Sequence, residues 1–420
     1  MTESLDDWLK KITKESMPGI QLGLDRCREL LISLDCLKNI KQTITVGGTN
    51  GKGSSVAMLE AIMLEYGCKV GTYTSPHIHK INERIKINGQ EISDHQLISS
   101  FAKIAENEKS TELTFFEYLT LAAIYFFSGQ KLDFIILEVG LGGRLDAVNC
   151  IDANIALISA IDIDHTEFLG DSREQIGFEK AGIMRKGEHA VCSDHNITNS
   201  ILEFAKVNEV NLHTLGVDFH IKGDETSWQW WTDNIMIEGN YNSLIKTDYQ
   251  LRNLSGVLKV LEILKVELKQ EKTQKALDAI RLRGRFQVFK CKNKEWVIDV
   301  AHNNQACVNL VKSVKKLPAV INNLGVFGLQ KTKRLQDFFE PLIGLVDLWF
   351  LPDFNEANFW SVSEIEDLLK RLGVRHTNIF VFKSTSDAVD AINLRNDEER
   401  VLVAGSFIVV KSVLEEIEAK

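Results

Sequence analysis

The sequence predicts an α/β protein with two domains, each built on a largely parallel sheet, and three observations support this. Continuous apolar runs typical of strands buried on both faces alternate with segments of helical periodicity. This alternation stops between about 210 and 250 and resumes after Arg285. The 420 residues also exceed the usual size of one domain, roughly 100 to 200 residues. We expect a first domain over residues 1–282 and a second over 283–420.

In the first domain, β-branched apolar runs, helical spacing and a capping signature each identify elements. They predict a strand over 43–46, a helix over 56–66, a strand over 69–74, a helix opened by Ser93-x-x-Gln96, a helix over 116–128, and strands over 132–140 and 155–161. This order predicts a doubly wound parallel sheet with right-handed crossovers. Residues 210–250 alternate polar and apolar side chains, which predicts a small antiparallel appendage, and two helices follow to about 281.

In the second domain, apolar runs again alternate with helical segments. The predicted strands are WVIDVA (296–301), VINNLGVFGL (320–329), LVDLWFL (345–351), NIFVF (378–382) and VLVAG (401–405). The last helix carries Val410, Val413, Leu414 and Ile417 on one face. A second α/β domain follows from this rhythm.

Composition excludes several classes of function. Lys and Arg number 49 against 58 Asp and Glu, so the formal net charge of −9 argues against nucleic acid as a partner. No stretch approaches the roughly 18 apolar residues of a membrane span, and the opening MTESLDDWLKK is acidic and polar. Seven scattered cysteines without a C-x-x-C pair fit neither a disulfide framework nor a zinc ribbon. We expect a cytoplasmic protein with no membrane partner, whose cysteines are reduced and mostly buried.

A glycine-rich segment over residues 47–54 (GGTNGKGS) lies between a predicted strand and a predicted helix. In that position backbone N–H groups and a helix N-terminus can hold phosphate oxygens, and Lys52 can neutralise their charge. The common pattern G-x-x-x-x-G-K-[ST] is not met, because Val46 stands at its first glycine and Gly53 separates Lys52 from Ser54. A plain glycine-rich turn is the alternative interpretation.

Polar residues follow or end three predicted strands of this sheet. Ser75 follows the second strand, Glu138 lies in a buried strand, and His165 follows the run over 155–161. Open α/β sheets bind ligands at the carboxyl ends of their strands, so these side chains could hold Mg²⁺ near a phosphate. Taken alone, His165 is better explained as a structural histidine. Glu138 requires a partner or a metal, because a buried carboxylate is costly without one.

With these motifs in order along the chain, the sequence resembles the dihydrofolate synthase/folylpolyglutamate synthase family, relatives of the Mur ligases. The residues that carry the resemblance are GTNGKGS (48–54), YTSPH (73–77), NERIKINGQEI (82–92), LTFFEY (113–118), LEVGLGGRLDA (137–147), DHTEFLG (164–170), EKAGI (179–183), GRFQ (284–287), DVAHN (299–303) and GSF (405–407).

The resemblance implies an N-terminal P-loop ATPase domain like the Mur ligase central domain, a C-terminal Rossmann-like ligase domain, and an active site in the cleft between them. It implies ATP-dependent amide formation: a carboxylate is phosphorylated to an acyl phosphate, which the amine of L-glutamate attacks. Dihydropteroate and folates are the implied acceptors of glutamate, and a monomer is the implied state.

The resemblance also assigns roles to individual residues. It places catalysis on Lys52, Lys180 and His165, with Lys180 carried as a carbamate. It places two Mg²⁺ ions on Ser75, Glu138 and His165. It places ATP on Thr49, Asn50, Gly51, Lys52, Gly53, Ser54, Asn253, Arg285 and Asp299. It places the pterin on Ile20, Gln21, Leu22, Thr114, Phe115, Phe116, Glu117, Leu145, Asp146 and Ala147.

Some of these residues have a plainer explanation, and some positions depart from the family. Phe115 and Phe116 fit core aromatics at the start of a helix, and Lys180 fits a solvated helix face. Gln21 stands where bifunctional bacterial members carry an acidic residue. The family's H-N-P reads His302-Asn303-Asn304, and of its H-D-K-D only Lys333 is retained.

Three other functions remain open at this point. The leading interpretation is a bifunctional ligase, because GGRLDA (142–147) and LTFFEY (113–118) resemble the bifunctional bacterial branch of the family. A monofunctional folylpolyglutamate synthase is the first alternative, a Mur-type amino-acid ligase shares the loop and the fold, and a P-loop switch shares the loop. The pterin motifs favour the first over the second. A switch leaves Arg285 and Asp299 without a role.

Overall fold

The computed structural model describes residues 3–224, 226–242, 245, 247–395 and 398–419. The chain divides into two compact units, Met1–Ile280 and Arg281–Lys420. The α/β class predicted from the sequence is confirmed in both units. No helix in the described part of the chain has the length and apolar character needed to cross a bilayer.

The first unit contains an eight-stranded sheet in the order β4-β3-β2-β5-β1-β6-β7-β8. Its strands are β1 (Thr43–Gly47), β2 (Val70–Tyr73), β3 (Ile85–Ile87), β4 (Gln90–Glu91), β5 (Phe134–Glu138), β6 (Ile155–Ile158), β7 (His189–Cys192) and β8 (Asn211–Thr214). Six of them are parallel, and only the β3–β4 hairpin is antiparallel to β2 at one edge. The predicted parallel sheet is therefore correct for its centre and wrong at this edge.

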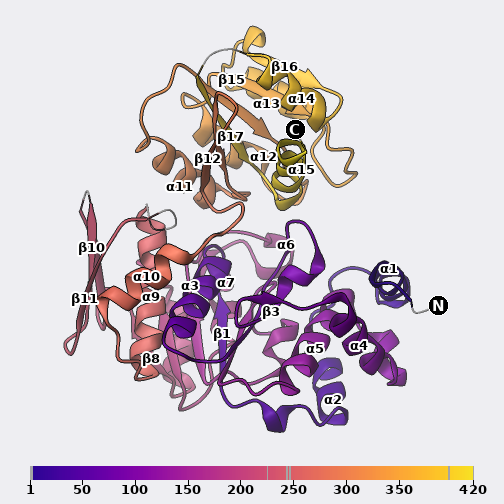
Figure 1. The fold of residues 1–420 in the computed structure, drawn as a ribbon, viewed down its shortest axis with the longest axis vertical. Helices are drawn as coiled ribbons and strands as arrows, with labels where there is room; N and C mark the ends of the chain where they lie inside the picture. The colour runs from indigo at the N-terminus through magenta and orange to yellow at the C-terminus, as the bar shows by residue number, and fades with distance from the viewer. Residues whose placement is uncertain (1–2, 225, 243–244, 246, 396–397, 420) are drawn as a thin grey trace. The chain divides into compact units, whose positions relative to one another are not determined.

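Helices cover both faces of this sheet, as Figure 1 shows for α3 (Lys52–Glu65), α9 (Asp248–Ile263) and α10 (Gln270–Ala279) on one side of β1 and α4 (Asp94–Ala105) and α5 (Phe115–Ser128) on the other. Alternate side chains of a strand point to opposite faces. Ala156 and Ile158 of β6 therefore join one core with buried residues of α4, α5, α7 (Arg173–Ala181) and α8 (Asn199–Val207). Leu157 faces the other side, where a Cβ added to Gly256 of α9 would approach it to 2.8 Å. The doubly wound arrangement is confirmed.

The helices described in the first unit include the five predicted ones (α3, α4, α5, α9 and α10) and five that the sequence did not predict. They are α1 (Leu5–Glu15), α2 (Asp25–Ser33), α3 (Lys52–Glu65), α4 (Asp94–Ala105), α5 (Phe115–Ser128), α6 (Thr166–Leu169), α7 (Arg173–Ala181), α8 (Asn199–Val207), α9 (Asp248–Ile263) and α10 (Gln270–Ala279), with 3₁₀ turns η1 (Leu37–Asn39), η2 (Ile81–Arg84), η3 (Glu108–Glu112) and η4 (Ala147–Cys150). The predicted capping box is present: the Gln96 N–H donates to Ser93 Oγ, and the Ser93 N–H donates to Gln96 Oε1 at 3.0 Å.

The predicted antiparallel appendage is also present. It is the three-stranded sheet of β9 (His220–Gly223), β10 (Ser227–Trp231) and β11 (Met236–Asn240), in which Trp228 and Trp230 are buried. The prediction began too early, because β8 still belongs to the parallel sheet.

The second unit is a six-stranded sheet in the order β12-β13-β17-β14-β15-β16. Its elements are β12 (Gln287–Cys291), β13 (Lys294–Ile298), α11 (Asn304–Val314), β14 (Asn323–Phe327), α12 (Leu335–Phe339), η5 (Glu340–Leu342), β15 (Leu348–Pro352), α13 (Val362–Arg371), η6 (His376–Asn378), β16 (Ile379–Phe382), α14 (Thr385–Asn393), β17 (Glu399–Ala404) and α15 (Phe407–Glu418). All pairs are parallel except β12–β13. The five predicted strands are confirmed, and β12 was not predicted.

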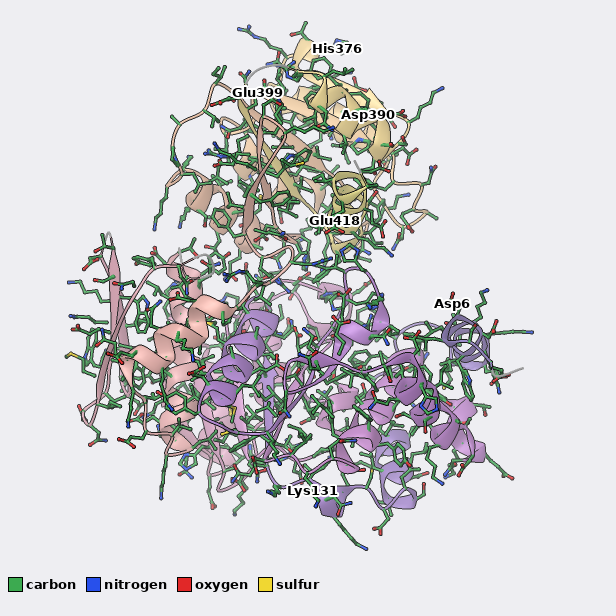
Figure 2. The ribbon with its side chains drawn as sticks, viewed as in Figure 1. Asp6, Lys131, His376, Asp390, Glu399 and Glu418 are labelled. Atoms are coloured by element: carbon green, nitrogen blue, oxygen red, sulfur yellow. The ribbon has the colours of Figure 1, made fainter. Side chains whose placement is uncertain are left out.

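Two features hold the second unit together. Its core is aromatic, since Phe327 lies 6.1 Å from Phe338 and 5.6 Å from Trp349 between ring centroids. At the start of β17, the buried Glu399 carboxylate accepts hydrogen bonds from Arg395 and lies 3.6 Å from Lys294 Nζ (Figure 2). Pairing lowers the cost of burying these charges.

The seven cysteines are free, and five of them are buried, which confirms the expectation of unpaired thiols.

Phe327→Ala is expected to lower the free energy of unfolding of the second unit by roughly 3–5 kcal/mol, because it removes a fully buried ring from an aromatic core. Chemical denaturation measures the loss. Phe380→Ala on the edge strand β16 is the control, since its side chain is 37% exposed. Equal losses in the two variants would contradict the position of the core.

Candidate active site

The glycine-rich segment forms a loop that joins the central strand β1 to the N-terminus of α3. Gly51 caps α3 in the left-handed region at a φ of 92°, and a Cβ there would lie 2.3 Å from Asn253 Oδ1. Both conditions require glycine. The loop therefore presents backbone N–H groups at a helix N-terminus, the arrangement that suits phosphate oxygens.

Lys52 folds over this loop. Its Nζ donates to Gly48 O at 3.0 Å and to Thr49 O at 3.2 Å. The ammonium group is thus held beside the N–H groups of the loop, where it adds positive charge to the same small volume. The sequence predicted this position for Lys52, and the local geometry fits a triphosphate.

Asn253 supplies an independent indication of a ligand. It lies on α9 against Gly51, and its Nδ2 is buried without a hydrogen-bond partner among the described residues. A buried donor without a partner is costly, so an acceptor supplied by a ligand would relieve it. The residues present fit a nucleotide phosphate or sugar.

Ser75 and Glu138 come together at the carboxyl edge of the sheet. Glu138 ends β5 beside Val46 of β1, is 2% exposed, and accepts a hydrogen bond from the Ser75 backbone N–H at 3.1 Å. His165 caps the short helix α6 after β6, the strand on the other side of β1. The strands β2 and β5 on one side of β1 and β6 on the other therefore end at the same edge as the phosphate loop.

These residues suit magnesium better than a metal that needs a full protein cage. Among the described residues, no group of three or more His, Cys, Asp and Glu is arranged to hold a metal ion. Mg²⁺ usually keeps several waters and takes only one or two carboxylates together with substrate phosphates. A carboxylate and a serine beside a phosphate loop satisfy that demand.

Lys180 is the least expected member of the site, because it is buried rather than on a solvated helix face. It lies on α7 and is 2% exposed. Burial, with repulsion from Lys52, lowers the pKa of Lys180 to about 7, although Asp164, Asp146 and Glu179 oppose this. A large fraction of this amine is therefore neutral near neutral pH, and only the neutral amine is nucleophilic.

Asp146 lies within reach of the same charges. Its carboxylate accepts hydrogen bonds from the N–H groups of Leu141 and Val148, at 2.7 and 3.0 Å. Burial raises the pKa of Asp146 to about 6, against these bonds and the attraction of Lys52. The Leu145–Ala147 segment is therefore coupled electrostatically to the phosphate loop.

The predicted pterin residues lie in neighbouring segments of the first unit. Ile20 and Leu22 are exposed apolar residues, and the Gly23 N–H donates to Leu145 O at 3.3 Å, which brings the segment 20–22 beside the segment 145–147. Arg26 adds a link that the sequence did not suggest. It donates to Gln21 O at 3.1 Å and to Glu117 Oε1 at 2.8 Å.

Some predicted pterin residues have structural tasks. Thr114 and Glu117 form the capping box of α5, in which the Thr114 N–H donates to Glu117 Oε2 at 2.8 Å. Phe116 packs against the backbone of Gly140, where a Cβ would lie 2.5 Å from its ring, and its centroid is 6.1 Å from that of Tyr73. Phe115 also packs against the main core. The core interpretation of both rings therefore holds alongside any contact with substrate.

In the second unit, Arg285 and Asp299 are neighbours. The Asp299 carboxylate accepts hydrogen bonds from the N–H groups of Phe286 and Ala301, both at 2.8 Å. Burial raises the pKa of Asp299, and Arg285 opposes the rise. The guanidinium of Arg285 lies over the ring of Phe407, 5.4 Å from its centroid. This unit thus holds a fixed carboxylate beside a half-buried cation.

Sequence reasoning missed several residues that organise the site. Ser159 holds the phosphate loop, Asp164 acts on Lys180, and Arg173 and Asp194 fix the segment that follows β6. The available signal was a run of acidic residues, Asp162 and Asp164, directly after a buried strand. Asp194 follows the unpredicted strand β7, so the pattern gave no reason to select it.

Comparisons with known proteins place the whole chain in one context. The Mur ligase middle domain matches residues 46–250, and the Mur ligase glutamate ligase domain matches residues 284–407. The dihydrofolate synthase/folylpolyglutamate synthase of Haemophilus influenzae is 35% identical over 429 residues, covering 97% of this chain and 96% of that protein.

Two solved structures match over nearly their full length. Escherichia coli FolC in complex with DHPP and ADP has a TM-score of 0.92 at 32% identity, covering 100% of this chain and 98% of that one. The bifunctional folylpolyglutamate synthase/dihydrofolate synthase of Yersinia pestis, complexed with AMPPNP and Mn ion, has a TM-score of 0.90 at 33% identity, with 99% and 98% covered.

Lys180→Met is expected to remove a pH dependence of stability. The pKa of Lys180 is about 7 in the folded chain against an ordinary value of 10.5. Between these values the unfolded chain binds more protons, so the free energy of unfolding of the wild type rises with pH. The free energy of unfolding of the wild type minus that of the variant should therefore rise by about 1.4 kcal/mol per pH unit across this window. Urea titrations at several pH values in CO₂-depleted buffer measure it, and a constant difference would contradict the burial of an ionisable Lys180.

Proposed function

The chain belongs to the dihydrofolate synthase/folylpolyglutamate synthase family of the Mur ligase superfamily, and from that premise we propose how its residues perform the reaction. It is a bifunctional ATP-dependent amide-forming ligase. It joins L-glutamate to dihydropteroate and extends folates with further glutamates. ATP and a divalent metal are its cofactors.

One observation on this chain's own residues supports this function. Asp146 lies in the segment predicted to bind the pterin, yet its carboxyl is attracted by Lys52 of the phosphate loop and acts on buried Lys180. This interaction supports a site in which the segment proposed for the pterin lies close to the loop proposed for the phosphates. That is the requirement for transferring a phosphoryl group to a folate carboxylate.

The chemistry needs activation, because a carboxylate is too poor an electrophile for an amine. Transfer of the γ-phosphoryl group of ATP to the substrate carboxylate forms an acyl phosphate and releases ADP. The α-amine of free L-glutamate then attacks the carbonyl carbon of the acyl phosphate, which stands either on dihydropteroate or on the last glutamate of a folate; the amine loses a proton and phosphate leaves. Lys52 and the loop N–H groups would bind the phosphoryl oxygens as negative charge spreads over them.

Magnesium would be held by Ser75, Glu138 and His165, with two ions expected, and would neutralise phosphate charge during transfer. The buried Glu138 carboxylate would keep its orientation through the Ser75 N–H. His165 would lie at the edge of the same region, fixed by its own N–H bond to Asp164 Oδ1 at 2.8 Å.

Lys180 would carry a carbamate. Its neutral amine can attack CO₂, losing a proton and forming an N–C bond, and the product is an anion in place of a cation. The lowered pKa of Lys180 supports this, because an ordinary lysine is almost fully protonated at neutral pH. The carbamate would face Lys52 and support the metal.

The remaining assignments follow from the same premise. Residues 1–282 would form the ATP-binding domain and 283–420 the ligase domain. Thr49, Asn50, Gly51, Gly53, Ser54 and Asn253 would contact nucleotide from the first domain, and Arg285 and Asp299 from the second. Ile20, Gln21, Leu22, Thr114, Phe115, Phe116, Glu117, Leu145 and Ala147 would line the pterin side.

We also propose that the protein works as a cytoplasmic monomer without nucleic acid or membrane partners. The free cysteines support a reducing compartment, and the net charge of −9 supports the absence of nucleic acid.

The proposed function is tested by phosphate release from ATP with Mg²⁺ and L-glutamate. We expect release to require both glutamate and a pterin acceptor, either dihydropteroate or tetrahydrofolate, because the acyl phosphate forms on the acceptor. Release with tetrahydrofolate but not with dihydropteroate as the acceptor, glutamate being present in both cases, would show that the enzyme is a folylpolyglutamate synthase only. Release with neither acceptor, but with a nucleotide-linked peptide, would point to a Mur-type ligase.

Lys52→Met is expected to lower kcat by about 10²–10³-fold, as removal of one charge-stabilising donor does in other active sites. Circular dichroism should show an unchanged fold, since Lys52 is half-buried and its head group donates to the carbonyls of Gly48 and Thr49 in the loop. Lys41→Met is the matched control, because Lys41 lies before β1 and pairs with Asp133 on the surface. Equal activity of Lys52→Met and Lys41→Met would show that Lys52 has no role in phosphoryl transfer.

A further inference from the structure

The phosphate loop rests on a second segment, residues 159–162, which follows β6. Ser159 Oγ donates to Asn50 O at 2.7 Å and to Gly47 O at 3.1 Å. The Thr49 N–H donates to Ala160 O at 2.7 Å. The Thr49 hydroxyl donates to Asp162 O and accepts from the Asp162 N–H, both at 3.0 Å. The conformation of residues 47–50 is therefore set by where the segment 159–162 lies.

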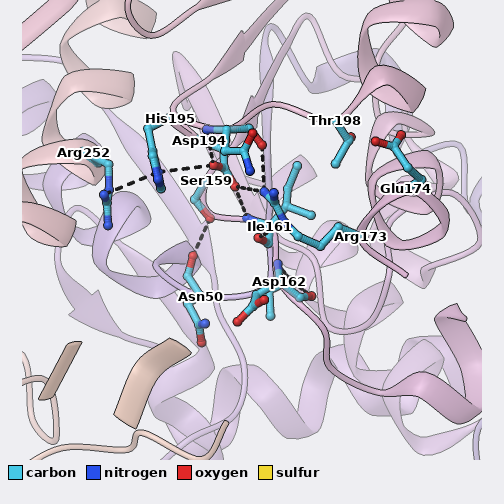
Figure 3. A network of polar contacts seen from close by, with 12 residues as sticks. Asn50, Ser159, Ile161, Asp162, Arg173, Glu174, Asp194, His195, Thr198 and Arg252 are labelled. Carbon is cyan, nitrogen blue, oxygen red and sulfur yellow. Dashed lines mark hydrogen bonds and ion pairs between the residues drawn. The ribbon is translucent and has the colours of Figure 1, made fainter. Parts of the chain in front are cut away.

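That segment is held on its other side by two side chains, Asp194 and Arg173, as Figure 3 shows. Asp194 Oδ2 accepts the Ile161 N–H at 2.6 Å, and Arg173 Nε donates to Ile161 O at 3.1 Å. The backbone N–H and the carbonyl oxygen of Ile161 are thus both hydrogen-bonded to charged side chains. The two side chains also pair with each other at 3.1 Å.

Asp194 is held in one orientation, because its side chain is buried and both of its carboxylate oxygens accept hydrogen bonds. Its side chain is 3% exposed, and its Oδ1 accepts the Asn196 N–H at 2.8 Å. Arg173 adds a bond from Nη2 to Asn196 O at 2.8 Å. Hydrogen bonds of this kind, between ionised side chains and backbone groups, are short and directional.

The same two residues join parts of the site that are far apart in sequence. Arg173 begins α7, whose last turn carries Lys180. Ile161 lies four residues before His165 and leads into Asp164. His195, next to Asp194, has its Nδ1 3.4 Å from Arg252 Nη1 on α9, the neighbour of Asn253. The pair lies where the supports of the loop, the metal residues and the nucleotide helix meet.

We propose that Asp194, acting with Arg173, is a positioning residue for the nucleotide: the pair clamps Ile161 and thereby holds Thr49 and Asn50 in the conformation that binds ATP phosphates. This inference rests on the proposed function. The effect of both side chains passes through the segment 159–162, which they bond and which in turn bonds the loop. Loss of the clamp should weaken nucleotide binding more than binding of glutamate or folate.

Asp194→Asn tests the clamp, because the amide keeps the shape of the carboxylate but cannot accept all three bonds or pair with Arg173. Arg173→Met is the second variant. Its side chain is 28% exposed, so this substitution is the safer one if Asp194→Asn does not fold. Glu262→Gln is the matched control, since Glu262 forms a half-buried ion pair with Lys259 on α9 and is not part of the loop or its supports.

We measure the Kd of AMPPNP with Mg²⁺ by calorimetry, and KM for ATP, L-glutamate and tetrahydrofolate by phosphate release. For Asp194→Asn and Arg173→Met we expect the AMPPNP Kd and the ATP KM to rise about 10-fold or more, with the other KM values within about twofold, by analogy with the loss of residues that orient metal ligands. Glu262→Gln should keep wild-type values even if its stability falls equally. A merely structural role would lower stability without this selective loss.

The outcomes separate the clamp from the enzyme's function. Wild-type AMPPNP affinity in a folded variant, or an equal rise of all three KM values, would overturn the clamp alone. Nucleotide binding by the wild type without turnover dependent on a pterin acceptor would overturn the proposed function, while a selective loss of AMPPNP affinity would still support the clamp. Failure of the wild type to bind AMPPNP would overturn both.

Discussion

The constraint on which the site depends is the position of β1 at the centre of a parallel sheet. Its neighbours β5 and β6 run beside it in the same direction, so Glu138 and the segment 159–162 end at the same edge as the phosphate loop. The loop is rich in glycine, and residues of other segments help to fix its shape. Ser159 and Asp162, which follow β6, bond to it, and Asn253 of α9 lies against Gly51. A change in those segments therefore reaches the phosphate loop through these contacts.

The second feature that organises the site is a cluster of charged side chains, of which Asp146 and Lys180 are buried. Lys52, Lys180, Asp146 and Asp164 act on one another, and burial raises the pKa of Asp146 while it lowers that of Lys180. Burial strengthens each interaction because the effective dielectric constant is low. It also makes any unpaired charge costly. A site of this kind is stable only when charges of opposite sign balance, and an arriving nucleotide with its metal changes that balance.

The sequence predicted the features that have a strong local signal. The strand–loop–helix around Lys52, the buried strand ending in Glu138 and the capping box at Ser93 each follow from side chains that are adjacent or periodic. The β3–β4 hairpin escaped because strands of three and two residues are too short to show alternation. The strand predicted over 155–161 ends at Ile158, because the next residues bond to the phosphate loop instead of continuing the ladder. The burial of Lys180 and the grip of Asp194 depend on contacts between segments far apart in the chain, and no periodicity encodes those.

The charges around Lys180 also decide which form of this residue suits the site. As an ammonium ion, Lys180 is repelled by the positive charge of Lys52 in the phosphate loop. As the proposed carbamate it would be attracted by Lys52, so the interaction that lowers the pKa of the amine would stabilise the modified group. Asp146, Asp164 and Glu179 work the other way: they favour the ammonium form and would repel a carbamate. The modified lysine therefore needs a further positive charge, and the magnesium proposed beside Glu138 would supply it. On this argument carbamate and metal stabilise each other, and each should bind more weakly when the other is absent.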